Sequence, residues 1–533
     1  MVRLTTCLNL VVAAAMTPRR ARLTMLGAIP PAAKRLKAPR VVLDAKRDAQ
    51  YFARAGYIFG AYKTYQLRTK VARRLLKPDK ETVDAWWSQQ HEWGGRQLYG
   101  LATDLQGFHL KGLQWLGARP DLVPTEWVRH LATLQDRCPP LDAATVDAVV
   151  SSELGRPLRE VFASFDPEPV GSASIAQVHR ARLRRKRWWR RRGGRVAVKV
   201  QRPGAERLML RDLKNIRSFL SSRIVRGSLA WDADAILDQI DGETAGEFDF
   251  TAEAARMDAA AATLAKPPPG RLRFLRRLFY TPPVAVPRAR AGLVTKRLLV
   301  MDFVSGIQLS RLAGEAGAKG SDAEAKMLFE HLGDAFGRLL FEDGFAGVHA
   351  DPHPGNLLVR RRGLGAGVGL VDWGQTKGVS LGLRLRLARV VAALGAPGGA
   401  DDVRAAIEQL GVAWNSTRSE ADQTAACVAT AVEWCDTRPL PAPFEADPTS
   451  EHYALTVFGE LTAFPVGLIY YLRATQYYRA MTEATGVEWS LADAIRPHAQ
   501  HLLRAQGRVE ANWAFDEEDL RGDVSEAVRR GGL

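Results

Sequence analysis

The chain has 533 residues, which is too long for one ordinary core, so two or more packed units are expected. Its four cysteines, Cys7, Cys138, Cys427 and Cys435, show neither a CxxC pair nor a regular spacing, which argues against a disulfide scaffold and a zinc site. The formal net charge is +17, but much of it is concentrated in short segments, and no nucleic-acid partner is expected from it.

Residues 1–43 have the composition of a targeting segment. The first acidic residue is Asp44, and the residues before it are rich in Arg, Lys and Ala, which is typical of a transit peptide for a plastid or mitochondrion. The apolar run Leu4–Met16 behind Arg3 also fits a secretory signal, alone or leading into a transit peptide. Because no apolar stretch reaches the ~18 residues that cross a bilayer, no integral membrane helix is expected.

Residues 44–150 predict a helical extension, because apolar side chains recur three and four positions apart, as at Tyr51, Ala55, Ile58 and Tyr62. Residues 151–305 predict a small lobe of sheet and helix. Its expected strands are 175–179, 196–200 and 297–304, and its expected helices are 204–224 and 231–264.

Residues 306–507 predict a mainly helical second lobe, interrupted by one hairpin. The expected strands are Asn356–Val359 and Gly369–Asp372, joined by a glycine-rich turn. A helix is expected from Leu381 to Leu394. The tail 508–533 is acidic and is expected to be loosely ordered, and the sequence defines no oligomeric state.

The basic insert 182–195 contains nine basic residues in fourteen, with Trp188 and Trp189 in its middle. Such a run suits phosphate binding with base stacking, or an anionic lipid surface with the indoles at headgroup level. A solvated hairpin tip is an equally good interpretation.

The segment His349–Asn356 carries the strongest chemical signal. Phosphoryl transfer needs a carboxylate to orient the attacking oxygen and an amide oxygen to hold a metal on the phosphates, and Asp351 and Asn356 supply these with the spacing of a kinase catalytic loop. Asp372, in Asp-Trp-Gly at the end of a strand, stands where a kinase places its second magnesium ligand.

A different class of site competes for the same residues. His349, Asp351 and His353 could bind a transition metal in a hydrolase. That interpretation leaves Asn356 and Asp372 without a role and needs a further cluster of ligands. For His353 alone, a turn whose histidine only caps and donates hydrogen bonds is also a sound interpretation.

Lys199 ends the strand-like Val-Ala-Val-Lys, the form in which kinases present an ammonium group to nucleotide phosphates. It needs a carboxylate partner on a helix, and Glu247, Asp249 and Glu253 are candidates. These three cannot share one helix face, so at least two roles are expected.

A phosphate-facing loop is expected before the first strand, where a kinase has G-x-G-x-x-G. Only one glycine is present, so the loop should be stiffer and should hold phosphates differently. The candidate nucleotide-binding residues are Gly171, Ser172, Ala173, Ser174, Ile175, Ala176 and Gln177, together with Lys199 and Glu253.

Six motifs in this order, PVGSASIAQVHRA, VAVKVQRPG, EFDFTAEA, LVMDFVSG, HADPHPGNLLV and LVDWGQTK, resemble the UbiB family of atypical kinases, also called the aarF-domain-containing kinases. The resemblance covers about residues 107–503. It implies an α+β, bilobal, protein-kinase-like fold with an N-terminal helical extension, which binds ATP and Mg²⁺.

The resemblance also implies a gate, formed by an N-terminal K-x-G-Q segment that folds over the active site. Here Lys111 and Gln114 stand in the family's places, although the order is K-G-L-Q. By the same resemblance, Glu247 and Asp249 form the pair that meets this segment, and Glu253 pairs with Lys199. Alanine-rich loops replace the glycine loop in this family, as residues 172–177 do here.

The family implies an ATPase or small-molecule kinase of prenyl-quinone or related lipid metabolism in an organelle. Apart from the resemblance, peripheral contact with an anionic membrane or with prenyl lipids is a candidate interaction of this chain. After Asp372 the sequence passes almost directly into a helical pattern and has no A-P-E motif, so a peptide-docking platform is not expected. The alternatives are a pseudokinase that binds nucleotide to scaffold a lipid-biosynthetic complex, and an ordinary protein kinase.

Overall fold

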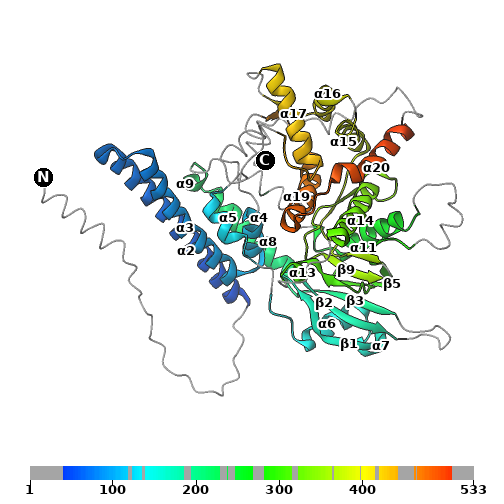
Figure 1. The fold of residues 1–533 in the computed structure, drawn as a ribbon. Coiled ribbons are helices and arrows are strands. Elements are labelled where there is room, and N and C mark those ends of the chain that lie inside the picture. The colour runs from blue at the N-terminus through cyan, green and yellow to red at the C-terminus, as the bar shows by residue number, and fades with distance from the viewer. Residues whose placement is uncertain are drawn as a thin grey trace, which may run out of the picture. The chain divides into compact units, whose positions relative to one another are not determined.

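The computed structural model describes residues 40–117, 123–134, 138–184, 194–227, 237, 246–267, 281–314, 322–362, 365–396, 398–414, 419–441, 461–463 and 465–506 (Figure 1). The predicted targeting segment up to residue 39, the centre of the basic insert at 185–193 and the acidic tail lie outside these residues. The chain divides after Arg47, and residues from Asp48 onward form one compact unit, which contains both predicted lobes.

The predicted helical extension is confirmed. Tyr62 and Tyr65 of helix α2, Arg40–Leu76, donate hydrogen bonds from their hydroxyls to the carbonyls of Gln90 and Trp86 on helix α3, Lys80–Leu105, at 3.3 and 2.7 Å. The two helices therefore lie antiparallel. Asp79 caps helix α3 at its N-terminus by accepting a hydrogen bond from the Thr82 N–H at 2.8 Å. The helices are α2 Arg40–Leu76, α3 Lys80–Leu105, α4 Gly107–Gly117, α5 Thr125–Leu131, α6 Ala143–Leu154 and α7 Leu158–Val161.

A five-stranded antiparallel sheet in the order β1-β2-β3-β6-β5 forms the first lobe. Strand β1 was not predicted, because Pro167 and Pro169 interrupt its sequence. The structure accommodates both prolines because β1 is an edge strand with an irregular register against β2. The strands are β1 Phe162–Ser172, β2 Ala176–Leu183, β3 Arg195–Gln201, β5 Ala289–Val294 and β6 Leu298–Asp302.

The alternation of strand β3 sorts its side chains between two environments. Val196, Val198 and Val200 are buried in a cluster with residues of α6, while Lys199 is turned to the opposite face. Helix α11, Phe250–Leu264, lies beside that opposite face. The first lobe also contains α8, Ala205–Leu220, and α9, Arg223–Arg226.

The second lobe is mainly helical, as predicted, and surrounds the long helix α14 (Figure 1). Its helices are α13 Leu309–Gly314, α14 Asp322–Phe341, α15 Leu381–Ala393, α16 Gly399–Leu410, α17 Glu420–Cys435, the 3₁₀ helix Val466–Leu468, α19 Ile469–Thr485 and α20 Leu491–Gln506. Its sheets are β4-β10-β9-β7, β11-β8 and β12-β13. The strands are β4 Val284–Ala285, β7 Ile307–Gln308, β8 Gly347–His349, β9 Leu357–Arg362, β10 Gly365–Leu370, β11 Thr376–Gly378, β12 Ala413–Trp414 and β13 Leu461–Ala463.

The hairpin β9–β10 is longer than predicted, because residues assigned to its turn belong to the strands. Gly365 pairs with Arg362 and Gly367 with Arg360. A β-carbon at Gly367 would lie 2.9 Å from the carbonyl oxygen of Pro283 on the neighbouring chain segment. The absence of a side chain at Gly367 therefore allows the backbone of the segment at Pro283 to lie close to β10.

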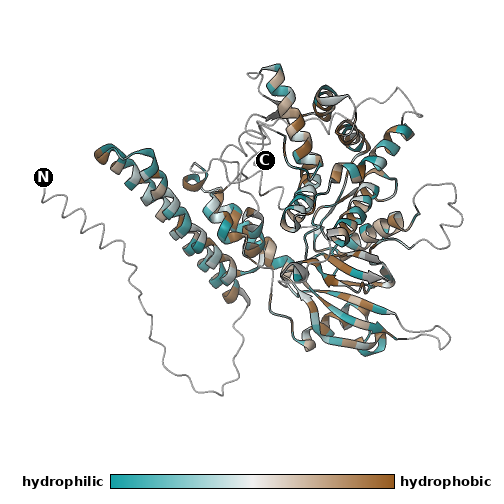
Figure 2. Ribbon diagram, viewed as in Figure 1, coloured by the Kyte–Doolittle hydropathy of each residue, from teal (hydrophilic) through white to brown (hydrophobic). Residues whose placement is uncertain are grey.

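Apolar residues gather on the strands of both lobes and on the inner faces of the helices (Figure 2). The largest buried cluster links α11, α14, α15, α19 and α20, and it includes Phe336, Tyr471 and Trp489. Among the described helices, none combines the length and the apolar character that a membrane-crossing segment requires.

Candidate active site

Lys199 lies between two carboxylates in the interior of the protein. Its ammonium nitrogen is 2.8 Å from Oε1 of Glu253 on α11 and 3.0 Å from Oδ1 of Asp372, and only 13% of its side chain is exposed. Burial alone would lower the pKa of Lys199, but the charges of Asp372 and Glu253 raise it above its ordinary value. The lysine is therefore charged, and the predicted pairing with Glu253 is confirmed.

Glu253 is the one helix-borne carboxylate among the three candidates. Within the predicted helix 231–264, Leu237 and Gly246 are helical, but helix α11 begins at Phe250, so Glu247 and Asp249 precede α11. Asp249 caps this helix by accepting a hydrogen bond from the Thr251 N–H at 2.9 Å. Burial raises the pKa of Glu253, and the charge of Lys199 opposes that rise.

Asp372 has a backbone conformation that non-glycine residues rarely adopt. It follows strand β10 with φ at +60°, in the left-handed region that aspartate tolerates better than most residues. The charge of Lys199 lowers the pKa of Asp372 to about 2, so the carboxylate is ionised. Strained residues of this kind cluster at functional sites.

Asp351 and Asn356 face each other across the tight loop that follows β8. The Asn356 side-chain amide donates from Nδ2 to the carbonyl of Asp351 at 3.0 Å. The Val371 N–H donates to the carbonyl of Asn356 at 3.0 Å, at the open end of the β9–β10 hairpin. Because Val371 precedes Asp372, this bond places the two predicted metal ligands on adjacent chain segments.

The donor set fits magnesium. Asn356 uses its amide nitrogen internally, which leaves Oδ1 as its ligand atom, and Asp372 adds ionised oxygens. Amide and carboxylate oxygens are the ligands that Mg²⁺ prefers, usually one or two of them together with phosphate oxygens. Asn356 and Asp372 would therefore hold the ion.

The histidines of the loop do not fit a transition-metal site. Nε2 of His349 donates to the carbonyl of Asp372 at 2.8 Å, and its Nδ1 accepts from the Asp351 N–H at 3.3 Å. Nδ1 of His353 accepts from the Gly355 N–H at 3.0 Å. The part of the chain that the structure describes contains no group of three His, Cys, Asp or Glu residues able to hold a metal. Within the described residues, this geometry gives no support to the hydrolase alternative.

Burial lowers the pKa of His349, so its ring is neutral near pH 7. A neutral ring can donate at one nitrogen and accept at the other, as these contacts require. His349 thus links the backbone of Asp351 to that of Asp372.

The alanine-rich loop connects β1 to β2 and is held by a residue that the sequence analysis missed. Arg202 donates to the carbonyl of Ala173 at 2.7 Å, to the hydroxyl of Ser172 at 2.6 Å and to the carbonyl of Pro139 at 2.7 Å. The Ala173 N–H also donates to the carbonyl of Ala176, at 2.9 Å. The signal for this clamp is the Gln-Arg-Pro-Gly sequence that follows Lys199.

Two residues of the predicted loop are buried in strand β2. Gln177 is fully buried: its Oε1 accepts from the Leu141 N–H at 2.7 Å and its Nε2 lies 2.7 Å from Nε2 of His179. Ala176 is also buried, within strand β2. Both residues lie within strand β2, whereas Gly171 and Ser172 end β1 and Ala173, Ser174 and Ile175 form the turn between the strands. That these seven residues contact the nucleotide stays a prediction.

The predicted gate is formed in part. Lys111 of α4 makes an ion pair with Glu247, and Nε2 of Gln375 donates to Oε1 of Glu247 at 3.2 Å. Gln375 follows Asp372 by three positions, so the extension is joined to the metal-ligand segment. Gln114, in contrast, donates to the carbonyl of Leu134 at 3.3 Å, and Asp249 is a helix cap; the pairing predicted for these two is not found within the described residues.

Arg473 is a further site residue that no motif indicated. Its Nη2 lies 3.3 Å from Oδ1 of Asp351, and Nε2 of His353 lies 3.8 Å from Oδ2 of the same carboxylate. Tyr477, one turn further along α19, has its pKa raised by burial and by the charge of Asp351. One face of α19 thus borders Asp351, the predicted catalytic carboxylate.

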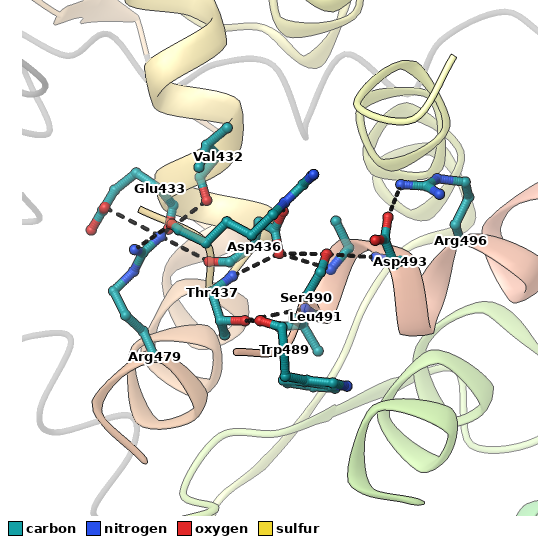
Figure 3. A network of polar contacts seen from close by, with 12 residues as sticks. Val432, Glu433, Asp436, Thr437, Arg479, Trp489, Ser490, Leu491, Asp493 and Arg496 are labelled. Atoms are coloured by element: carbon teal, nitrogen blue, oxygen red, sulfur yellow. Dashed lines mark hydrogen bonds and ion pairs between the residues drawn. The ribbon is translucent and has the colours of Figure 1, made fainter. Parts of the chain in front are cut away.

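Helix α19 is fixed in place by a buried polar network behind the site (Figure 3). Nη2 of Arg479 donates to the carbonyls of Val432, Glu433 and Asp436, at 3.1, 3.3 and 2.8 Å. The fully buried Asp436 accepts from the Ser490 hydroxyl at 2.8 Å, which ties in the start of α20. The network therefore holds α19, and with it Arg473, in a fixed position beside Asp351.

The segment after Asp372 is short. Strand β11 pairs with β8, Thr376 opposite His349, and α15 begins at Leu381 with Ser380 as its cap. The predicted helix is confirmed, and the connection of β11 to α15 leaves no space for a long activation segment.

A sheet lobe with a lysine paired to a helix-borne glutamate, a helical lobe with Asp351 and Asn356 on one tight loop, and an ionised Asp372 at the end of a hairpin define a protein-kinase-like fold. Residues 133–398 match the family model described as the ABC1 atypical kinase-like domain. The chain belongs to the UbiB, or aarF-domain-containing, family of atypical kinases.

Three curated relatives illustrate the similarity. AarF domain-containing protein kinase 1 of Xenopus tropicalis is 30% identical over 54% of this chain and 50% of its own length. Protein ACTIVITY OF BC1 COMPLEX KINASE 8, chloroplastic, of Arabidopsis thaliana is 33% identical over 46% of this chain and 29% of its own length. Probable protein kinase UbiB of Pseudomonas putida is 34% identical over 50% of this chain and 45% of its own length. The match thus spans half or less of these relatives' lengths.

Among solved structures, the complex of Rv3197 with erythromycin from Mycobacterium tuberculosis has a TM-score of 0.47 and 20% identity, covering 80% of this chain and 98% of that one.

Proposed function

We propose that this chain cleaves ATP bound with magnesium, as an ATPase or a small-molecule kinase. The observation that carries the proposal is the position of Lys199, whose ammonium nitrogen contacts both the helix-borne Glu253 and the ionised Asp372. Kinases use this trio to hold a lysine on the nucleotide's phosphates and a metal beside it.

Each residue has a distinct task in this proposal. Lys199 neutralises phosphate charge, and Glu253 keeps its ammonium in place. Asp351 orients the attacking oxygen and accepts its proton. Asn356 and Asp372 would hold magnesium through their oxygens, and the ion would neutralise charge that develops on the phosphates. Arg202 holds the loop that covers the nucleotide.

We propose further that the reaction serves prenyl-quinone or related lipid metabolism in a plastid or mitochondrion. The family is linked to ubiquinone and plastoquinone biosynthesis, and two Arabidopsis relatives are named as chloroplastic. The composition of residues 1–43 supports an organelle. Imaging of the full chain with a C-terminal fluorescent tag would test this; a cytosolic signal would contradict it.

The activity is tested with purified full chain by release of ADP, with and without magnesium, and with prenyl-quinone headgroup analogues present. Magnesium-dependent turnover is expected, and it should be lost in Asp372→Asn and Lys199→Arg. Turnover that survives both substitutions would mean that another site or a contaminant is responsible.

A nucleotide-binding pseudokinase scaffold is the second candidate. It is favoured by the direct contact of Lys199 with Asp372, in which the lysine occupies one oxygen of a predicted metal ligand. Nucleotide that raises the thermal midpoint without any ADP release would support the scaffold. Labelled phosphate transferred to a protein in trans would instead indicate an ordinary protein kinase.

A further inference from the structure

The outer face of α2 carries apolar side chains that are largely exposed in the described unit. Tyr57, Leu67, Val71 and Leu75 are 63%, 64%, 48% and 69% exposed, and the Tyr57 ring makes an edge contact with Trp93 of α3 at 5.7 Å between centroids. With Gly60 and Thr64 they recur three and four positions apart, so they lie along one side of the helix over about five turns. We call these four residues the α2 stripe.

The opposite side of the same helix is already used. Tyr51, Ala55 and Ile58 are buried in a cluster with Leu101 and Leu105 of α3. The hydroxyl of Tyr65 donates to the carbonyl of Trp86 on α3, at 2.7 Å. The α2 stripe is therefore not a misassigned core face, and at the glycine between its members, Gly60, a β-carbon would meet nothing within 4 Å.

The charge around the α2 stripe has one sign. Residues 49–78 contain seven Lys or Arg and no Asp or Glu. Lys63, Lys70 and Arg74 flank the stripe on one side and Arg68 on the other, at helical offsets of about 40–100° from it. Cations that flank an apolar stripe in this way match the arrangement of helices that lie in the interface of an anionic bilayer.

Other occupants fit less well. A second copy packed along the same stripe would bring two strongly cationic surfaces together, which like-charge repulsion opposes. A nucleic acid would pair with the cations but would leave four large apolar side chains in water.

We propose that the α2 stripe docks this protein on an anionic lipid surface, with α2 lying in the plane of the bilayer interface and α3 behind it. Leu67, Val71 and Leu75 enter the boundary between headgroups and acyl chains. Lys63, Lys70 and Arg74 contact lipid phosphates. The site is distinct from the nucleotide site and does not depend on turnover.

The test is flotation of the purified full chain with vesicles of phosphatidylcholine alone, or of phosphatidylcholine and phosphatidylglycerol in equal amounts. Flotation with the anionic vesicles alone is expected. Leu67→Glu with Leu75→Glu should weaken partitioning at least about tenfold, since it places charge in the apolar layer. Lys70→Gln with Arg74→Gln should weaken it about fivefold for each cation removed.

Matched controls are Ile307→Glu, which alters an apolar side chain 53% exposed in the second lobe, and the exposed Lys326→Gln. Both should float like the unchanged chain, and the thermal midpoint of every variant should stay the same. Flotation that persists in the α2 variants overturns the proposal. So does equal partitioning to neutral vesicles, self-association lost in the leucine variant, or RNA binding in place of vesicle binding.

Discussion

Arg473 Nη2 lies 3.3 Å from Oδ1 of Asp351, although 122 positions separate the two residues. A carboxylate that acts as a general base must be held in one orientation to accept a proton along a defined direction. Helix α19 supplies that restraint from outside the catalytic loop, through a guanidinium on a helix held by a buried network at Arg479.

Arg473→Ala should lower kcat about tenfold, because Asp351 loses its orienting partner, whereas Asp351→Asn should lower it about 10²–10³-fold. The KM for ATP should stay unchanged, since Arg473 is not placed on the phosphates. Steady-state ADP release checks both. Arg473→Lys should recover only part of the rate, because lysine lacks the planar fork. Glu483→Ala at an exposed position of the same helix is the control, and a rise in turnover for Arg473→Ala would show that the guanidinium blocks the site.

Lys199→Met should lower the free energy of unfolding by about 3 kcal/mol, because it leaves the buried Glu253 without its partner. Urea unfolding followed by tryptophan fluorescence measures this. The double variant Lys199→Met with Glu253→Leu should recover much of the loss. Lys296→Met, which breaks an exposed pair with Glu206, should change the value by less than about 1 kcal/mol. If Lys199→Met and Lys296→Met lowered the free energy of unfolding by similar amounts, the buried pair would stabilise the fold no more than the exposed pair does.

Lys111→Ala should raise basal ATP turnover about fivefold, the effect of removing about 1 kcal/mol of coupling between the extension and the segment after Asp372. ADP release without any acceptor is the measurement. Gln114→Ala serves as the matched control, since its amide donates to the carbonyl of Leu134 within the extension rather than to Glu247. Unchanged or reduced turnover in Lys111→Ala would mean that the ion pair does not restrain the site.

His498 on α20 gives the stability a pH dependence. Its Nε2 lies 3.0 Å from Asp334 and its Nδ1 3.5 Å from Glu342. Burial alone would lower the pKa of His498, but these carboxylates raise it above its ordinary value. Its contribution is therefore complete below about pH 6.5 and is lost as the pH rises through the raised value.

The thermal midpoint of His498→Gln should thus fall below that of the unchanged chain at about pH 6, by the equivalent of about 1 kcal/mol, and the difference should shrink at about pH 9. Asp334→Asn should reduce the same difference. A gap that is constant with pH would point to lost side-chain contacts rather than to charge.

The sequence predicts the site where function depends on short, local patterns. Lys199, Asp351, Asn356 and Asp372 each stand in a motif whose strand or loop context is readable, and the structure brings Lys199 into contact with Asp372 as a kinase fold requires. Arg473 has no such signal, because one arginine on an amphipathic helix looks like any solvated charge until tertiary structure places it beside Asp351.

The fold shows the same division. Regular helices and the central strands follow from periodicity, whereas β1 was missed because an edge strand tolerates prolines that local pattern treats as breaks. By contrast, β2 begins at Ala176, one residue from the start of the predicted strand 175–179, because its β-type residues are readable from the sequence.

Helix α19 lies outside the segment by which the family is recognised, which ends at residue 398. A fragment cut at the family boundaries would retain every motif residue from Lys199 to Asp372, yet it would lack both the guanidinium on Asp351 and the ion pair from Lys111. The residues that contact the candidate site therefore extend beyond the recognisable domain at both ends, and the buried network at Asp436 that holds α19 also lies outside that domain.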